Sequence, residues 1–221
     1  MAEVNLLRAL PAGKRNIQKR KDAKDLNVIA AAKQFGQMYF DGPREYGYGG
    51  YRYDGRWVPV AHDIVSHFDI KPGMRVLDVG CAKGFLVKDM MLACPGIEAF
   101  GIDVSSYALL HCEPESIGRL HLGSADNLPF PDSAFDAVLA INTLHNLTRD
   151  GCARAIKEMN RVSRDPAKCF IQVDAYRTEA EKVLFESWCL TAITYLTPLE
   201  WVSLFEEAGY KGDYFWTILE A

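Results

Sequence analysis

The stretch VLDVGCAKGF, residues 76–85, joins a short apolar run to a glycine-rich turn. Its aliphatic and β-branched residues predict a buried strand, and its glycines predict a turn into the helix-like stretch of residues 85–93. A turn of this kind allows a ligand to approach the backbone and the helix N-terminus closely. The stretch therefore predicts a strand–turn–helix unit with a ligand site at the turn.

The same alternation of strand-like and helix-like segments continues through the rest of the chain. The apolar runs expected as strands are residues 74–80, 97–104, 119–125, 135–142, 168–176 and 213–221. The helical patterns are residues 57–68, 85–93, 105–112, 152–163, 178–190 and 198–209. Such alternation is typical of crossover connections between parallel strands. We expect an α/β fold with a Rossmann-like, doubly wound, mostly parallel sheet that has helices on both faces.

Composition and charge narrow the class of protein. The chain has 25 Lys+Arg and 29 Asp+Glu in 221 residues, a formal net charge of −4 that gives no overall reason to expect nucleic acid. Neither a membrane-spanning run nor a secretion leader is expected. The six cysteines stand singly, so we expect no metal site and a reduced, cytoplasmic setting. One basic stretch, residues 14–24, is either a solvated helix or an arm for nucleic acid, and a weak role in attracting substrate lies between the two.

Acidic residues at the predicted strand ends indicate the chemistry of the ligand. A dinucleotide fingerprint would need glycine at positions 82 and 85, which hold Ala82 and Phe85. Asp78, directly before the turn, favours a ligand with a cationic centre over a pyrophosphate. The number of residues between Gly80 and Asp103 matches the sequence spacing at which a carboxylate binds ribose hydroxyls in nucleotide-binding folds. The pattern therefore argues against NAD and favours a cationic, ribose-containing cofactor.

These motifs resemble those of class I S-adenosylmethionine-dependent methyltransferases. VLDVGCAKG is similar to the first motif of the family, GIDVSSYAL to the second and SADNLPFPDSAFDAV to the third. The resemblance continues through LHNL, IKEMNRVS and TPLEWVSLFEEAGY, and it covers about residues 56–212. It implies a catalytic domain at residues 56–221 with an N-terminal helical and loop cap at residues 1–55. The chain departs from the family at Ala82 and by offering only one strand after the last helix.

The resemblance also implies which residues bind the cofactor, S-adenosyl-L-methionine. Asp78 would lie near the methionine amine, and Asp103 would hold the ribose hydroxyls. Asp126 would frame the adenine, with Asn127 or Leu128. The full set expected at the cofactor is Asp78, Gly80, Ala82, Gly84, Asp103, Val104, Ala125, Asp126, Asn127, Asn142 and Tyr48.

The methyl acceptor is expected beyond the carboxyl ends of the fourth and fifth strands. His145 is the candidate catalytic base there, because an ordinary imidazole is largely neutral at pH 7. The alternative is that His145 hydrogen-bonds the substrate, or caps a turn, without proton transfer. Trp188, with Tyr176 and Arg177, could complete the acceptor site from the other side, although Trp188 could also belong to the core.

The segment of residues 36–57 holds six glycines and five tyrosines, a composition that predicts a long loop. In one interpretation, its tyrosines and Arg52 form a lid over the sulfonium and the acceptor. In the other, they pack an N-terminal cap on the sheet. The segment is similar to that of a bacterial subgroup associated with sugar and surface-polysaccharide pathways.

The resulting hypothesis is methyl transfer to an oxygen or nitrogen of a small polar metabolite, possibly sugar-linked. Nucleic acid and membrane partners are not expected. One alternative is an RNA or protein methyltransferase that uses the basic stretch. The other is a binding module that keeps the cofactor site without turnover.

Overall fold

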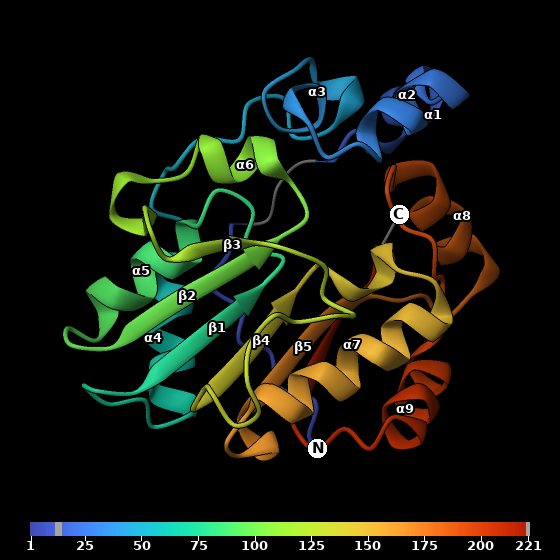
Figure 1. Ribbon diagram of the computed structural model, residues 1–221. Helices are drawn as coiled ribbons and strands as arrows, with labels where there is room; N and C mark the ends of the chain where they lie inside the picture. The colour runs from blue at the N-terminus through green and yellow to red at the C-terminus, as the bar shows by residue number, and fades with distance from the viewer. Residues whose placement is uncertain (12–14, 220–221) are drawn as a thin grey trace.

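The computed structural model describes residues 1–11 and 15–219, and it shows one parallel sheet of six strands in the order β3-β2-β1-β4-β5-β6 (Figure 1). The strands are β1 (Arg75–Val79), β2 (Glu98–Asp103), β3 (Leu120–Leu122), β4 (Ala137–Ile141), β5 (Cys169–Asp174) and β6 (Asp213–Thr217). All neighbouring strands pair in parallel. The predicted doubly wound α/β architecture is confirmed, and each predicted strand contains an observed one; residues 220 and 221 of the last prediction lie outside the described residues.

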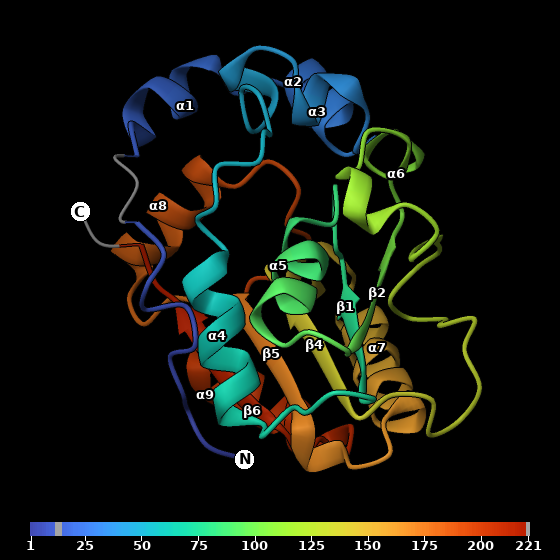
Figure 2. The same ribbon diagram turned by 90° about the vertical axis from the view of Figure 1, so that its left-hand side faces the viewer.

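Helices cover both faces of the sheet, as Figure 2 shows. Helices α4 (Val58–His67) and α5 (Phe85–Ala93) pack together on one face, and α7 (Arg149–Val162) and α9 (Pro198–Glu207) on the other. The alternation of side chains along a strand supplies both interfaces. In β4, Leu139 joins the cluster beneath α4 and α5, whereas Val138 joins the cluster beneath α7 and α9.

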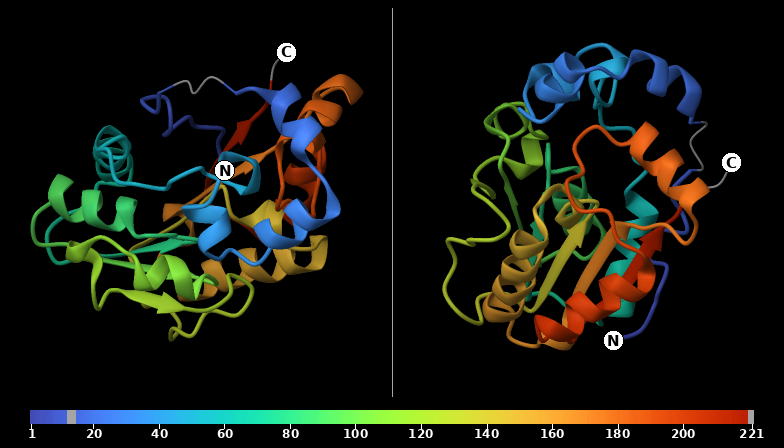
Figure 3. Two further views of the ribbon diagram at one scale, coloured as in Figure 1. Left: turned by 90° about the horizontal axis from the view of Figure 1, so that it is seen from above. Right: turned by 90° about the vertical axis from the view of Figure 1, so that its right-hand side faces the viewer.

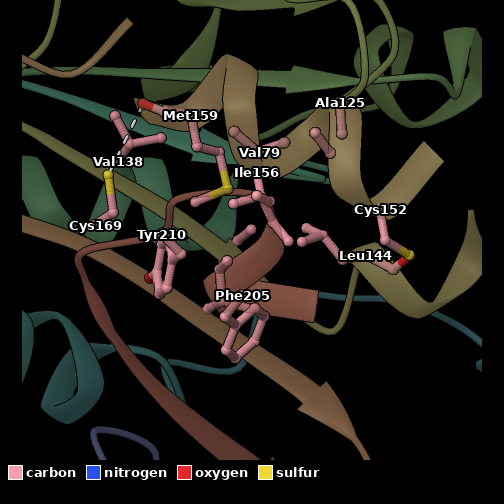
Figure 4. Close-up of a cluster of buried hydrophobic side chains, with 14 of the residues drawn as sticks. Val79, Ala125, Val138, Leu144, Cys152, Ile156, Met159, Cys169, Phe205 and Tyr210 are labelled. Atoms are coloured by element: carbon pink, nitrogen blue, oxygen red, sulfur yellow. Dashed lines mark hydrogen bonds between the residues drawn. The ribbon is translucent and has the colours of Figure 1, made fainter. Parts of the chain in front are cut away.

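The core beneath α7 and α9 is built from large apolar side chains of both layers (Figure 4). Ile156 and Met159 of α7 and Phe205 of α9 are fully buried against the strands. Tyr210 donates its hydroxyl hydrogen to the Asp213 carbonyl at 2.8 Å. This packing holds the carboxyl ends of β1, β4 and β5 in fixed positions beside one another.

The far edge of the sheet is completed by the start of the chain. Glu3 forms a parallel bridge with Tyr214 of β6, and the Val4 amide donates to the Tyr214 carbonyl at 2.8 Å. Leu6 is buried with the α4 and α5 cluster. The first residues of the expected N-terminal extension therefore pack with the sheet, and they cover part of the edge where only one strand was expected.

Residues 15–57 arch over the carboxyl ends of the strands, as Figures 2 and 3 show. This cap contains α1 (Ile17–Ala23), α2 (Leu26–Ala32), α3 (Gln37–Phe40) and the 3₁₀ turn η1 (Arg44–Tyr46). The glycine- and tyrosine-rich segment, expected as a loop, thus contains a short helix and a turn. The cap meets α6 (Ser106–Leu110) through α3, and α8 (Glu179–Trp188) through α1.

Three further 3₁₀ turns connect the elements of the sheet and its covering helices. They are η2 (Pro114–Ser116), η3 (Leu144–Asn146) and η4 (Pro166–Lys168). Of these, η3 directly follows the carboxyl end of β4 and carries His145. In the described part of the chain, no helix combines the length and apolar character needed to cross a membrane.

Candidate functional site

Two adjoining cavities lie between the cap and the carboxyl ends of the strands. The smaller, of about 190 Å³, lies by β2 and the loop after β3, and the larger, of about 760 Å³, lies by β1, β4 and β5. Five residues line both cavities: Tyr39, Tyr48, Gly80, Ala82 and Asn142. The two cavities thus form one site that is bounded by the turn after β1 below and by the cap above.

The turn after β1 has a backbone that only small residues allow. Gly80 has φ +83°, and a Cβ there would lie 2.0 Å from Thr143 Oγ1. Ala82 adopts φ +48°, the left-handed region that disfavours a side chain by about 1–2 kcal/mol. Gly84, with φ +74°, precedes α5, and its Cβ would meet Ser116. Gly80 and Ala82 line both cavities, whereas Gly84 lines neither cavity and shapes the start of the helix.

Asp78 presents a buried carboxyl group to the larger cavity. Its residue is 7% exposed, and among the described residues its carboxylate has no hydrogen-bond or ion-pair partner. Burial, and then the neighbouring charge of Asp103, raise the pKa of Asp78 to about 7. A buried acid without a partner would be stabilised as a carboxylate by a cationic group in the cavity.

Asp103, at the end of β2, faces the smaller cavity and orders the turn after β1. One carboxylate oxygen accepts from the Ala82 amide and the other from the Ser105 amide, both at 2.8 Å. Burial raises the pKa of Asp103. Each oxygen retains acceptor capacity toward a ligand hydroxyl, and Val104 lines the same cavity.

The residues expected around the adenine divide into two groups. Ala125 is buried and lines the smaller cavity. Asp126 instead pairs with Arg154 of α7 at 2.7 Å and accepts from Ser124 Oγ. Asn127 is exposed, and neither Asp126 nor Asn127 is among the residues that line the cavities. The role of Asp126 and Asn127 at the cofactor stays a prediction.

His145 lies at the larger cavity, where β4 and β5 end. It is 1% exposed, and its Nδ1 accepts from the Asp174 amide at 3.3 Å. Burial lowers the pKa of His145 and raises that of Asp174. The amide contact leaves the proton of the neutral ring on Nε2. The ring can therefore donate a hydrogen bond, and the neighbouring Asp174 carboxylate is the group with the chemistry of a proton acceptor.

One group of potential metal ligands lies in the same region. Donor atoms of His145, Asp174 and Cys189 all lie within 4.8 Å of one another. His145 already accepts a backbone hydrogen bond at Nδ1, and burial raises the pKa of Cys189, which disfavours the thiolate that a metal needs. The chemistry of this group fits proton sharing better than metal binding.

The cap combines features of both interpretations of the tyrosine-rich segment. Tyr48 lines both cavities, as expected of a lid. Tyr51 lines the larger cavity and stacks on Phe85 at 4.7 Å, and Tyr53 donates to Asp89 at 2.6 Å, as expected of a packed cap. Tyr46 packs against a small apolar cluster formed by Val28 and Ala32 of α2 together with Leu190.

An ion pair anchors this cap to the turn after β1. Asp41 accepts from Lys83 Nζ at 2.7 Å, and the Lys83 side chain is 8% exposed. Tyr107 of α6 donates its hydroxyl hydrogen to the same carboxylate at 2.8 Å. Asp41 therefore ties the cap both to the turn after β1 and to α6.

The basic stretch of residues 14–24 is a docked helix in its described part, residues 15–24; Lys14 lies outside the described residues. Lys24 Nζ donates to the Cys189 carbonyl at 2.7 Å, at the end of α8. Arg15 and Arg20 line the larger cavity, while Lys19 and Lys21 are exposed. The stretch thus presents its arginines to the site and Lys19 and Lys21 to solvent, while Lys24 binds the end of α8.

Sequence reasoning missed several residues that line the site. Phe35 and Phe40 line the smaller cavity from the cap, and Arg15, Arg20 and Arg44 line the larger one. Among the residues expected to complete the acceptor site, Trp188 lines the larger cavity, whereas Tyr176 and Arg177 line neither. The missed residues belong to the cap, which contains no predicted strands. Their positions therefore could not be inferred from the alignment of strand ends in a parallel sheet.

The residues present fit S-adenosylmethionine. Asp78 offers an unpartnered carboxylate for its positive charge, and Asp103 offers acceptor capacity for ribose hydroxyls. Gly80 leaves open the space that a Cβ would fill. The apolar walls of the smaller cavity, Ile102 and Phe40 among them, suit a flat aromatic base.

Comparison with known proteins gives the same answer at the level of family. The model described as "Methyltransferase domain" matches residues 77–171. A sterol 24-C-methyltransferase of Gibberella zeae is 31% identical over 106 residues, covering 44% of this chain and 28% of the relative. A demethylmenaquinone methyltransferase of Symbiobacterium thermophilum is 28% identical over 155 residues, covering 66% and 60%. The chain thus spans less than two thirds of either relative.

Solved structures agree on the fold. A methyltransferase in complex with the activator Trm112 of Haloferax volcanii has a TM-score of 0.57 at 19% identity, covering 69% of this chain and 68% of that one. The YcgJ protein of Bacillus subtilis has a TM-score of 0.53 at 20% identity, covering 67% and 66%. The motifs, the sheet and the matched family together lead to one assignment. Residues 77–171 match the methyltransferase domain family, and the motifs and the sheet are those of a class I S-adenosylmethionine-dependent methyltransferase, whose cofactor is S-adenosylmethionine.

Proposed function

We propose that the protein transfers a methyl group from S-adenosylmethionine to an oxygen or nitrogen of a small polar molecule, for example a sugar-linked one. The observation that carries the proposal is the larger cavity, of about 760 Å³. It is lined both by Asp78 of β1 and Gly80 of the turn after it, and by His145 and Asp174. That volume is in the range of small-molecule sites. The cap above it favours a ligand that can be enclosed over one that lies on the surface.

In this proposal, Asp78, Gly80, Ala82 and Asp103 hold the cofactor, with Tyr48 of the cap above them. The bound cofactor supplies an activated methyl group on a cationic sulfur. The cavity residues contribute by orienting the acceptor and excluding water, since holding two reactants in line can supply much of the rate. Tyr48 and Trp188 offer flat faces of the kind on which a sugar or ring can rest.

We assign proton handling to the pair His145 and Asp174. His145 would donate from Nε2 to the acceptor, and Asp174 would take the proton that a hydroxyl loses during attack. Burial raises the pKa of Asp174, which makes it a stronger base than an exposed aspartate. In this assignment, Asp174 is the base and His145 binds the substrate without proton transfer, which is the alternative role considered for His145.

A labelled-cofactor assay tests the proposal. The protein is incubated with methyl-labelled S-adenosylmethionine and three separate fractions of a cell extract: small molecules, RNA and protein. We expect label in the small-molecule fraction. Asp174→Asn and His145→Gln should lower turnover by about 100-fold or more with little change in cofactor affinity.

His121→Gln, an exposed histidine outside both cavities, is the matched control and should keep full activity. Label appearing only in RNA or protein would contradict the proposed acceptor class. Cofactor binding without label in any fraction would indicate a binding module instead. We also place the protein in the cytoplasm, a proposal supported by its six free cysteines.

A further inference from the structure

Three arginines of the cap converge on one aromatic ring in the larger cavity. The guanidinium carbons of Arg20, Arg44 and Arg15 lie 4.9, 5.2 and 5.9 Å from the centroid of Trp188. The arginines come from the start of the cap, from α1 and from η1, whereas Trp188 ends α8. All four residues line the larger cavity.

Their charge is only partly compensated within the described residues, where Asp174 is the acid near Arg15 and Glu45 the acid near Arg20. None of the three forms an ion pair with a carboxylate there. Arg20, only 7% exposed, donates to the Gly47 carbonyl at 2.9 Å and to the Glu45 carbonyl at 3.3 Å, and Arg44 also donates to the Gly47 carbonyl. Burial and the neighbouring guanidinium lower the pKa of Arg20, and burial lowers that of Arg44. The cluster therefore holds like charges close together, and the hydrogen bonds of Arg20 and Arg44 go to neutral carbonyl groups.

A purely structural role accounts poorly for this arrangement. Cation–π contact with an aromatic ring is favourable for each cation, but one arginine would be enough to join the cap to α8. Three like charges at one ring repel one another, and each guanidinium has five N–H donors, more than the carbonyl contacts use. An anion in the cavity would relieve the repulsion and accept the remaining donors.

We propose that the acceptor carries an anionic group, a phosphate or a carboxylate, that binds between Arg15, Arg20 and Arg44 beside Trp188. This inference rests on the proposed function, in which the larger cavity receives the acceptor. Phosphate and carboxylate share the chemistry that arginine recognises, since both offer paired oxygens to the guanidinium fork. The anionic group would fix one end of the acceptor and leave its nucleophilic atom to be oriented toward Asp174.

The distribution of charge favours a small anion over a nucleic acid. The chain as a whole has a net charge of −4, which gives no general attraction for a polyanion. All three arginines line the cavity beneath the cap, with Arg15 at its exposed margin, whereas Lys19 and Lys21 of α1 line neither cavity. Because the positive charge lines a cavity and the protein as a whole is acidic, it favours a small anion that fits the cavity over a nucleic acid that binds at the surface.

Calorimetry with inorganic pyrophosphate and with succinate, at low salt, tests the inference on the full chain. We expect one of the two anions to bind, and the tighter one identifies phosphate or carboxylate as the recognised group. Arg15→Gln and Arg44→Gln should each weaken that binding by about tenfold or more. Lys19→Gln, which removes a charge from α1 outside both cavities, should leave it unchanged. Arg20 is avoided because it is buried and donates to two cap carbonyls, and Arg15, for which no such contact is described, separates anion binding from the packing of the cap.

Two results would overturn the inference: no binding of either anion by the parent protein, or an equal loss in Lys19→Gln and Arg15→Gln. A short RNA that binds and is weakened equally by both variants would identify surface attraction instead. S-adenosylmethionine binding, measured on the same samples, separates this failure from that of the proposed function. Cofactor binding without anion binding rejects only the anionic subsite, whereas loss of both rejects the proposed function.

The labelled-cofactor assay gives a second readout. When the small-molecule fraction is divided on an anion-exchange column, the label should appear in the retained part. Arg15→Gln should raise the acceptor KM by about tenfold or more with little change in kcat, because the arginine binds away from the reacting atom. Label confined to the unretained part would contradict the inference.

Discussion

At the residue scale, Asp78 is a buried acid whose protonation should respond to a bound cation. Its pKa of about 7 in the protein lies above the ordinary value of 3.8 because the carboxyl group is buried next to Asp103. The unfolded chain loses this proton near pH 4, whereas the folded protein keeps it to about pH 7. The ligand-free protein therefore loses stability as the pH rises between these values. A cation bound beside Asp78 would reverse this effect by favouring the carboxylate.

We therefore expect S-adenosylmethionine affinity to rise with pH up to about 7 and then level off. Below pH 7 the dissociation constant should change by up to about tenfold per pH unit, because binding then releases the Asp78 proton. Asp78→Asn should weaken binding at pH 7.5 and flatten the profile. Calorimetry in buffers of different ionisation enthalpy measures both the affinity and the released proton.

The control is Asp150→Asn, an exposed acid of α7 outside both cavities, which should keep the parent profile. A flat profile in the parent protein, or an unchanged profile in Asp78→Asn, would remove Asp78 from the cofactor site. A parallel shift of all three proteins would instead identify a titrating group elsewhere.

Residues next to strand ends could be predicted, and residues of the cap could not. Asp78 and Asp103 end neighbouring strands, so a parallel sheet necessarily brings them to one edge. Arg20 and Trp188 meet only because α1 docks on α8, and no periodicity relates two residues so far apart in the chain. The acids of the cofactor site therefore follow from topology, whereas the arginines of the acceptor side follow from packing.

At the element scale, the strands were the most predictable parts, because each is a short apolar run bounded by turn residues. The segment of residues 36–57 was less so, since its glycines favour a loop. α3 forms there nonetheless, with Phe40 buried between Tyr48, Tyr51 and Tyr107. The packing of Phe40 against aromatic rings of the cap and of α6 thus outweighs the preference of the glycines for a loop.

The anchor between this cap and the turn after β1 should carry measurable stability. Asp41→Asn leaves the nearly buried ammonium of Lys83 without its counter-charge, so we expect a loss of about 2–3 kcal/mol in the free energy of unfolding. Cofactor affinity should fall as well, because the cap and the turn both border the site. Denaturant unfolding and calorimetry measure the two effects.

Glu207→Gln is the matched control, since the Arg149–Glu207 pair is half exposed on both sides. Exposed pairs contribute about 0–1 kcal/mol, so this variant should remain close to the parent protein. Equal destabilisation in the two variants would show that the cap anchor contributes no more than a surface pair.

At the scale of the whole molecule, the site lies between two layers that a ligand would join. The sheet edge supplies Asp78 and Asp103, and the cap supplies Tyr48 and the arginines. A ligand that contacts both layers stabilises each against opening of the other. The cap should therefore become more protected when the cofactor binds, even though it lies outside the matched domain of residues 77–171.

Saturating S-adenosylmethionine should raise both the melting temperature and the protection of the cap. At a concentration of about 100 times the dissociation constant, binding adds about 2.7 kcal/mol, which corresponds to roughly 5–10 °C for a chain of this size. Hydrogen exchange should slow in residues 37–51 and remain unchanged at exposed positions of α9. NAD at the same concentration is the control and should shift neither quantity, because Ala82 and Asp78 do not suit a pyrophosphate. A shift with NAD alone would reject the cofactor assignment, whereas stabilisation by S-adenosylmethionine without added protection in the cap would show that the cofactor contacts only the sheet edge.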